Sequence, residues 1–156
     1  MSFASTIPST RPVSIIAVQW KNAAGARIVS LSNETARGIN SNTYAATDWS
    51  DGTIYASGRG IRGGSFGTGN FTSATIFSTI TDQLDSVYVN GSQRTRTQIV
   101  TTGDNDNFDA LGRVYFTGNQ PNGRIAFVVA ISENLTDALR KRLEHSAAFA
   151  WKISCN

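Results

Sequence analysis

Short runs of β-branched and aromatic residues, separated by polar turn residues, fill most of the chain. The most compact run is residues 13–20, and its almost unbroken apolar character is typical of a strand that is buried on both faces. Residues 21–25, ending in Gly25, have the composition of a turn. We therefore expect residues 26–32 to form the antiparallel partner of this strand.

The clearest local turn is Asn90-Gly91. These two residue types tolerate the positive φ angles of a type I′ turn, which predicts a hairpin between residues 87–90 and 92–101. Six of the residues between 58 and 69 are glycines. This density favours a flexible surface loop, and the order of residues is not that of a phosphate-binding loop. Further strands are expected over residues 72–81, 84–90, 113–117 and 124–132.

Helical periodicity appears only near the end of the chain. Thr136 is a suitable N-cap and Asp137 suits the first turn of a helix over about 136–151. One side of this helix is apolar, and we expect it to dock against a sheet. The apolar side consists of Leu135, Leu139, Leu143, Ala147, Ala150 and Trp151. The whole pattern predicts an all-β antiparallel sandwich with one C-terminal amphipathic helix.

Composition narrows the classes of protein. A chain of 156 residues is long enough for one core, and we expect one domain over residues 13–156, preceded by an extended N-terminal arm over residues 1–12 that contains Pro8 and Pro12. The net charge is +3, but the basic residues are scattered, which argues against a nucleic-acid partner. We see neither a signal peptide nor an apolar run long enough for a membrane span, and expect no membrane partner.

Several segments together resemble the laminin-G-like, concanavalin A-like jelly-roll domains. The Tyr-Val-Asn-Gly motif lies within residues 87–91, a long strand opens with Gly-Arg-Ile over 123–131, Leu-Thr-Asp-Ala follows at 135–138, and the helix ends in Ala-Trp-Lys at 150–152. Residues 12–18 resemble the Pro-x-x-Ile-x-Ala-Val strand of these domains. The resemblance implies a jelly roll over nearly the whole chain and says little about function.

One departure from this family concerns the start of the domain. The strand that usually precedes the Pro12 segment is missing. Either the 1–12 arm replaces it or a sheet edge stays open, and open edges invite strand pairing between molecules.

The residue types that commonly act in catalysis are not grouped in this sequence in a way that suggests an enzyme. Glycoside hydrolases of similar fold need two carboxylates flanking the scissile bond, and no strand here carries such a pair. His145 is the only histidine and is expected on the helix surface, and Cys155 lies in a tail that we expect to fray. The sequence therefore predicts a protein that is not an enzyme.

Two groups of residues are candidates for ligand binding. Asp104, Asp106 and Asp109 repeat hard oxygen ligands within a short segment, which suits Ca²⁺, although an ordinary solvated loop explains them as well; no other cofactor is expected. Trp49 and Tyr44 lie among polar residues and could stack on a sugar ring. Packing is the commoner role of such aromatic residues.

These observations lead to two hypotheses. The first is a non-enzymatic structural protein of a bacteriophage virion, either a capsid decoration or head protein or a tail-fibre component. It would be made in the host cytoplasm and would assemble with itself and other virion proteins through its arm and sheet edge. The alternative is a carbohydrate-binding, lectin-like module that recognises a surface glycan through Trp49 and Tyr44.

Overall fold

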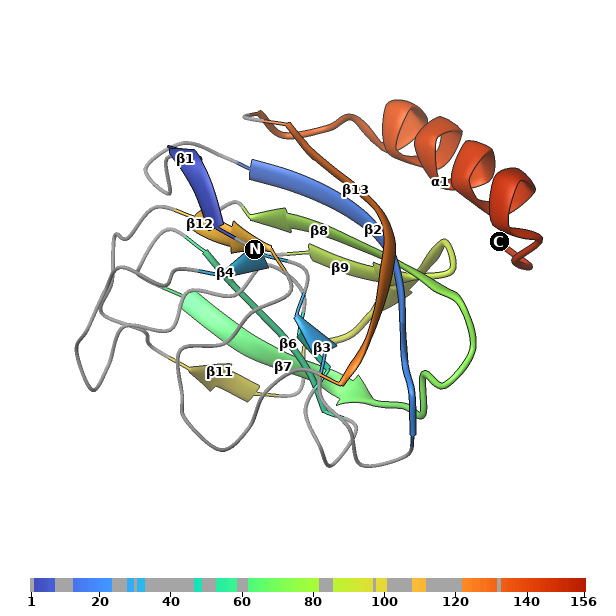
Figure 1. The fold of residues 1–156 in the computed structure, drawn as a ribbon, viewed down its shortest axis with the longest axis horizontal. Helices are drawn as coiled ribbons and strands as arrows, with labels where there is room; N and C mark the ends of the chain where they lie inside the picture. The colour runs from blue at the N-terminus through green and yellow to red at the C-terminus, as the bar shows by residue number, and fades with distance from the viewer. Residues whose placement is uncertain are drawn as a thin grey trace.

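Thirteen strands and one helix make up the described part of the chain in the computed structural model (Figure 1). All strand pairs are antiparallel, and the helix follows the last strand. This confirms the expected all-β architecture with one C-terminal helix. The structure describes residues 2–7, 13–23, 28–29, 31–32, 47–48, 53–58, 62–81, 86–96, 98–100, 108–111, 122–131 and 133–156.

The central sheet has five strands in the order β10-β9-β8-β2-β13. Its strands are β10 (Ser92–Arg94), β9 (Ser86–Val89), β8 (Thr75–Thr81), β2 (Val13–Lys21) and β13 (Gly123–Ile131). The β2 strand pairs with β8 on one side and with β13 on the other. The expected pairing of residues 13–20 with 26–32 is therefore wrong, because the longer strands β8 and β13 offer β2 more ladder hydrogen bonds than a two-residue strand could.

The second sheet packs against one face of the central sheet. Its order is β11 (Gln98–Val100), β7 (Arg62–Thr68), β6 (Thr53–Gly58), β5 (Thr47–Asp48) and β3 (Ile28–Val29). Side chains of the two sheets meet in an apolar core, in which the rings of Phe71 and Phe77 lie edge to face with centroids 4.9 Å apart. The buried core between the sheets consists of Ile54, Phe66, Phe71, Phe77, Val87 and Val89.

The glycine-rich segment contributes to this second sheet instead of forming a loop. Residues 62–68 are strand β7, which pairs with β6 in a hairpin. Glycines tolerate extended backbone as well as turns, so their density alone did not distinguish the two structures. Of the described glycines in this segment, Gly67 has a positive φ of 81°.

A third sheet of three short strands brings the start of the chain into the fold. Its order is β1 (Ser2–Ile7), β12 (Phe108–Leu111) and β4 (Leu31–Ser32). Ser2 pairs with Ala110 and Ile7 pairs with Phe108. Residues 2–7 are thus extended, as expected for the arm, but they pair within their own chain and their ladder hydrogen bonds are made there.

The other face of the central sheet is covered by helix α1 (Asp137–Trp151), as Figure 1 shows. Six consecutive side chains of β2, from Ser14 to Gln19, are buried, which confirms a strand covered on both faces. The outer core under the helix consists of Ile16, Val18, Ile76, Leu135, Ala147 and Ala148. None of the helices in the described ranges has the length and apolar character of a membrane span.

Local sequence features set the ends of α1 and the hairpin beside it. Thr136 is the N-cap and accepts a hydrogen bond from the backbone N–H of Leu139 at 3.3 Å, which confirms the predicted helix start. Asn90 and Gly91 have φ angles of 49° and 83°, and Val89 pairs with Ser92 across them. The predicted Asn-Gly turn is confirmed, but the second strand of the hairpin ends at Arg94 and not at residue 101, because residues 98–100 form β11 and pair with β7 in the second sheet.

Candidate docking surface

Strand β13 forms an open edge of the central sheet. It spans nine residues and pairs with β2 on one side, and no strand of the described ranges pairs with its other side. A free strand edge presents a row of backbone N–H and C=O groups to which another extended chain can hydrogen-bond. Among the described residues, this edge is therefore the best candidate for binding another extended chain.

The side chains of β13 make this edge unusually apolar. Arg124 is the one charged residue in the strand, and it lies near the beginning. Soluble proteins normally protect long edge strands with charges, prolines or bulges in the middle of the strand. Here the irregularity in the ladder falls between Ile125 and Phe127, which leaves the remaining part of the strand regular. The half-buried apolar side chains are Ile125, Ala126, Phe127, Val128, Val129 and Ile131, and Ala130 is exposed.

The register with β2 assigns the β13 side chains to two faces. Phe127 lies opposite Val18 and Val129 opposite Ile16, so both belong to the face under α1. Val128 lies opposite Ala17 and Ala130 opposite Ile15, on the face toward the second sheet. Phe127 and Ile131 also pack against the outer core. The edge is therefore held firmly on its β2 side, while its other side has no strand partner among the described residues.

The end of β13 is tied to the start of the helix by one buried hydroxyl. The Oγ of Ser14 donates to the carbonyl oxygen of Glu133 at 2.7 Å and accepts from the N–H of Leu135 at 3.0 Å. Ser14 is 1% exposed, so both backbone groups depend on it. This pair of hydrogen bonds fixes how the chain leaves β13 and enters α1.

The opposite edge of the central sheet is the short strand β10, and the C-terminal tail covers the turn that leads into it. The C-terminal tail, residues 153–156, folds back over the β9–β10 hairpin: the N–H of Asn156 donates to the carbonyl oxygen of Asn90, and its side-chain amide donates to the Oγ of Ser92 at 2.8 Å. The expectation of a fraying tail is wrong, because these contacts hold it. Burial, followed by the negative charge of Glu144, raises the pKa of the Cys155 thiol and keeps it protonated at neutral pH.

Helix α1 docks with a charged side that the sequence pattern did not indicate. Arg140 is 2% exposed and Glu144 is fully buried, with 2.5 Å between their side chains. The guanidinium of Arg140 also lies 3.6 Å from the ring centroid of Tyr88 on β9 and bonds Asp137. Burial lowers the pKa of Arg140, but hydrogen bonds to Asp137 and Glu144 outweigh it, so the pKa is raised and the charge is retained. Hydrogen bonds from Arg140 and Lys141 lower the pKa of Asp137.

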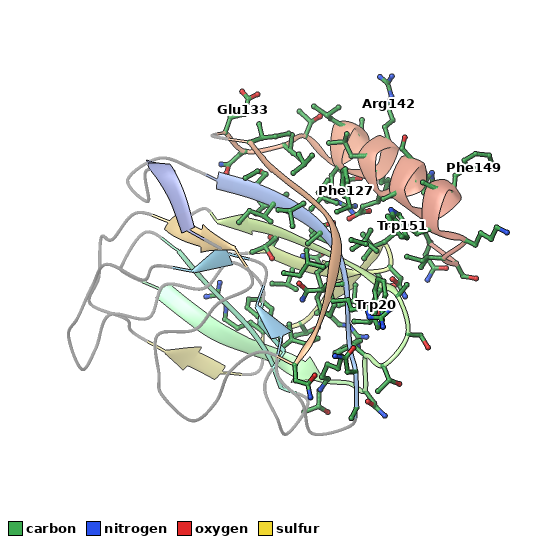
Figure 2. The ribbon with its side chains drawn as sticks, in the orientation of Figure 1. Trp20, Phe127, Glu133, Arg142, Phe149 and Trp151 are labelled. Atoms are coloured by element: carbon green, nitrogen blue, oxygen red, sulfur yellow. The ribbon has the colours of Figure 1, made fainter. Side chains whose placement is uncertain are left out.

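The predicted apolar side of α1 is only partly the buried side. Leu135 and Ala147 are buried as expected, whereas Leu139 and Trp151 are about two-fifths exposed. The correction follows from spacing: Arg140, Glu144, Ala147 and Ala148 also share one side of the helix, and the small alanines allow close approach to the sheet. Figure 2 shows Phe149 and Arg142 pointing away from the sheet. Phe149 is 91% exposed.

Most of the predicted ligand-binding residues lie outside the described residues. These are Trp49, Tyr44, Asp104 and Asp106. Asp109 lies in strand β12, and its side chain is not described. Within the described ranges no three metal-ligating side chains come together. The calcium and sugar sites remain predictions.

Two other expectations can be compared with the structure. His145 is exposed on α1, as expected for a surface histidine. Trp20 is half-buried and packs against the outer core, in agreement with its expected core role. The Arg140–Glu144 pair was missed, although its four-residue spacing followed by Ala147 and Ala148 was visible in the sequence.

Comparisons with solved structures show that this chain shares its fold with known proteins. No family model matches the chain, and no curated relative is similar to it. Solved structures of Trypanosoma rangeli sialidase are similar: one has a TM-score of 0.63 at 11% identity, one in complex with sialic acid 0.58 at 13%, and a mutant displaying trans-sialidase activity 0.61 at 14%. Each match covers 89% of this chain but 23% of the sialidase chain.

These neighbours overturn the prediction that the chain is not an enzyme. Solved structures that share its architecture include sialidases, which are enzymes, so this architecture is no argument against enzymatic activity. The prediction required that catalytic residues be recognisable as a short sequence motif. At such low identity the similarity shows a shared fold alone, and this chain corresponds to under a quarter of the sialidase length.

Proposed function

We propose that this chain is an assembly module: a β-sandwich that joins a larger structure by accepting an extended strand on the free edge of β13. The single observation that supports this proposal is the nine-residue, largely apolar edge with no strand of the described ranges beside it. Backbone hydrogen bonds along such an edge supply affinity, and alternate side chains supply selectivity.

The larger structure in this proposal is a bacteriophage virion, in which the chain is a capsid decoration, head or tail-fibre component with a jelly-roll topology. Support for the topology comes from the laminin-G-like segments described above. Because residues 2–7 pair with β12 of the same chain, the proposal assigns assembly to the β13 edge and no longer to the N-terminal arm.

Photo-crosslinking in the assembly isolated from cells that make the protein tests this role. A photo-reactive side chain in place of Ala130, which is exposed near the end of β13, is expected to crosslink to a neighbouring chain. The matched control is Gln93, exposed in the middle of β10 on the opposite, polar edge, which is expected to give no such product. Crosslinking at Gln93 but not at Ala130 would contradict the proposal.

A second candidate function is carbohydrate binding, which the likeness to sialidases, including one in complex with sialic acid, favours. In this candidate Trp49 and Tyr44 contact the glycan and Asp104, Asp106 and Asp109 hold Ca²⁺. A glycan array that includes sialylated glycans, read once with calcium and once with chelator, tests it. Specific binding that disappears with chelator supports this function with its calcium site, and an empty array in both conditions opposes it.

A further inference from the structure

We propose that the strand received by the β13 edge is β13 of a second copy of this chain. The two strands run antiparallel about a two-fold axis at Val129 and join two central sheets into one continuous sheet. This inference rests on the proposed assembly function and specifies its partner. The distribution of charged and apolar side chains along β13 supports it.

Charge is the first argument. Each end of the strand region has one exposed charged residue, and the two have opposite signs: Arg124 at the beginning and Glu133 just beyond the end. Figure 2 shows Glu133 projecting from the end of β13. Antiparallel self-pairing brings Arg124 beside the partner's Glu133, and the two-fold axis repeats this contact. Parallel pairing would instead place like charges together at both ends.

The register follows from the irregularity in β13. Directly opposed residues of an antiparallel pair point to the same face of the sheet. A pairing centred on Val129 places Phe127 opposite the partner's Ile131. The ladder with β2 shifts by one residue between Ile125 and Phe127. Counting the same shift on the free side places Arg124 opposite the partner's Glu133.

The two neighbouring registers, shifted by one residue in either direction, match the charged and apolar side chains less well. Centring the pair on Val128 puts Arg124 opposite the partner's Ile131. Centring it on Ala130 puts Phe127 opposite the partner's Glu133. Each alternative places a charge against a large apolar side chain, which costs solvation of that charge. Among these three registers, the Val129-centred one matches apolar with apolar and positive with negative.

Apolar matching is the second argument. In the Val129-centred register, Phe127 and the partner's Ile131 form an aromatic and β-branched pair, a combination that stabilises antiparallel sheets. Both residues are half-buried in the single chain and pack against the outer core. Val129 meets its own copy on the same face, and Val128 lies opposite the partner's Ala130 on the other face. The strand is thus complementary to itself, as a two-fold interface requires.

A charge-reversal series on the purified full-length protein tests the pairing. We expect sedimentation equilibrium to show a dimer of the wild-type chain at micromolar concentration. R124E and E133R each replace two attractions with two repulsions, and each is expected to weaken dimerisation about tenfold. The R124E/E133R variant restores opposite charges and is expected to return to within about threefold of wild type.

Two controls keep the series interpretable. Arg124 and Glu133 are exposed, so thermal unfolding of the variants at a concentration where they are monomeric is expected to be unchanged. R142E reverses an exposed charge on α1 that points away from the sheet and is expected to leave the dimer unaffected.

The outcomes separate the inference from the function on which it rests. A wild-type protein that stays monomeric, or a dimer that the double reversal fails to restore, overturns the β13 self-pairing. If the crosslink from position 130 then reaches a different protein, the assembly function stands with another partner. If neither a dimer nor a crosslink from position 130 is found, both proposals fail.

Discussion

The central sheet ends in the three-residue strand β10 on one side and in the nine-residue strand β13 on the other. The β10 edge is polar, and the C-terminal tail lies over its hairpin with hydrogen bonds from Asn156 to Asn90 and Ser92. The β13 edge is long and apolar, and no strand of the described ranges pairs with its free side. The two edges of one sheet thus differ in length and in polarity, and the tail contacts the turn beside the shorter one.

The difference shows that the protection of an edge involves more than strand length. On the protected side, α1 presents its charged residues: Arg140 stacks on Tyr88 of β9, and Glu144 is buried beside it. On the β13 side, Phe127 and Ile131 make apolar contacts with the outer core. Charged contacts within the chain therefore stabilise the sheet beside β10, whereas the β13 edge has apolar surface that a further strand would cover.

Removal of one partner of the buried ion pair is the strongest way to disturb the protected side. Glu144→Ala leaves the Arg140 charge buried with its carboxylate partner lost on that side, and is expected to reduce the free energy of unfolding by about 3–5 kcal/mol. Urea denaturation measures this loss. The control R140M/E144L replaces both charges with apolar groups and is expected to stay within about 1 kcal/mol of wild type. Equal losses in both variants would show that the charges themselves are needed.

A side chain at position 91 is expected to displace the tail from the β9–β10 hairpin. Gly91 has a φ of 83°, and an added Cβ would overlap the carbonyl oxygen of Asn156. Gly91→Ala should cost about 2–3 kcal/mol, partly as left-handed strain of about 1–2 kcal/mol. Gly67→Ala is the matched control, because Gly67 has a φ of 81° with nothing within 4 Å of the added atom.

The thiol of Cys155 reports the same event. Its raised pKa results mainly from burial, so release of the tail in Gly91→Ala should speed alkylation by iodoacetamide at pH 8. Gly67→Ala should alkylate at the wild-type rate. Identical rates in all three proteins would mean that the tail does not depend on contact at Gly91.

Two serines on the outer face of the central sheet test how the end of β13 is anchored. Ser14→Ala removes both hydrogen bonds to the Glu133–Leu135 segment and should cost about 1–2 kcal/mol in urea denaturation. Ser78 is equally buried, but its hydroxyl has no hydrogen-bond partner. Ser78→Ala should therefore change the free energy of unfolding by less than about 0.5 kcal/mol, and a loss as large as that of Ser14→Ala would refute this explanation.

The smallest effect on folding is expected at the open edge itself. Ala130 is exposed, so Ala130→Lys should alter the unfolding free energy of the monomer by less than about 0.5 kcal/mol. A lysine on an edge strand opposes strand addition, so the same variant should lose association by sedimentation equilibrium. Gln93→Lys on β10 should lose neither. Unchanged association of Ala130→Lys would show that β13 is not the contact.

Features that depend on neighbouring residues could be predicted from the sequence. Thr136 caps the helix and Asn90-Gly91 forms the turn, because both rely on bonds and φ angles within a few residues. The unbroken apolar run in β2 indicated burial on both faces for a similar reason. The strand partners were not predictable in this way: residues 28–29 pair with β5, and β2 pairs with segments much farther along the chain.

The candidate docking surface could likewise be predicted from the sequence only in part. The sequence left open whether the N-terminal arm takes the place of the missing strand or a sheet edge stays open, and the strand order of the folded sheet was needed to identify β13 as an edge strand. The tail around Cys155 was expected to fray, yet hydrogen bonds to Asn90 and Ser92 hold it. A search for local motifs was no basis for the prediction that the chain is not an enzyme, since solved proteins that share the fold include sialidases.

The sequence alone thus determined an all-β chain with one C-terminal helix, because turn geometry, capping and hydrophobic periodicity are local properties. The tertiary structure decided which strands pair, which edge stays open and which side of α1 is buried. Arg140 lies inward because Tyr88 receives its guanidinium and the small side chains of Ala147 and Ala148 allow the helix to approach the sheet. Such choices depend on contacts between residues far apart in the chain, which a local pattern does not settle by itself.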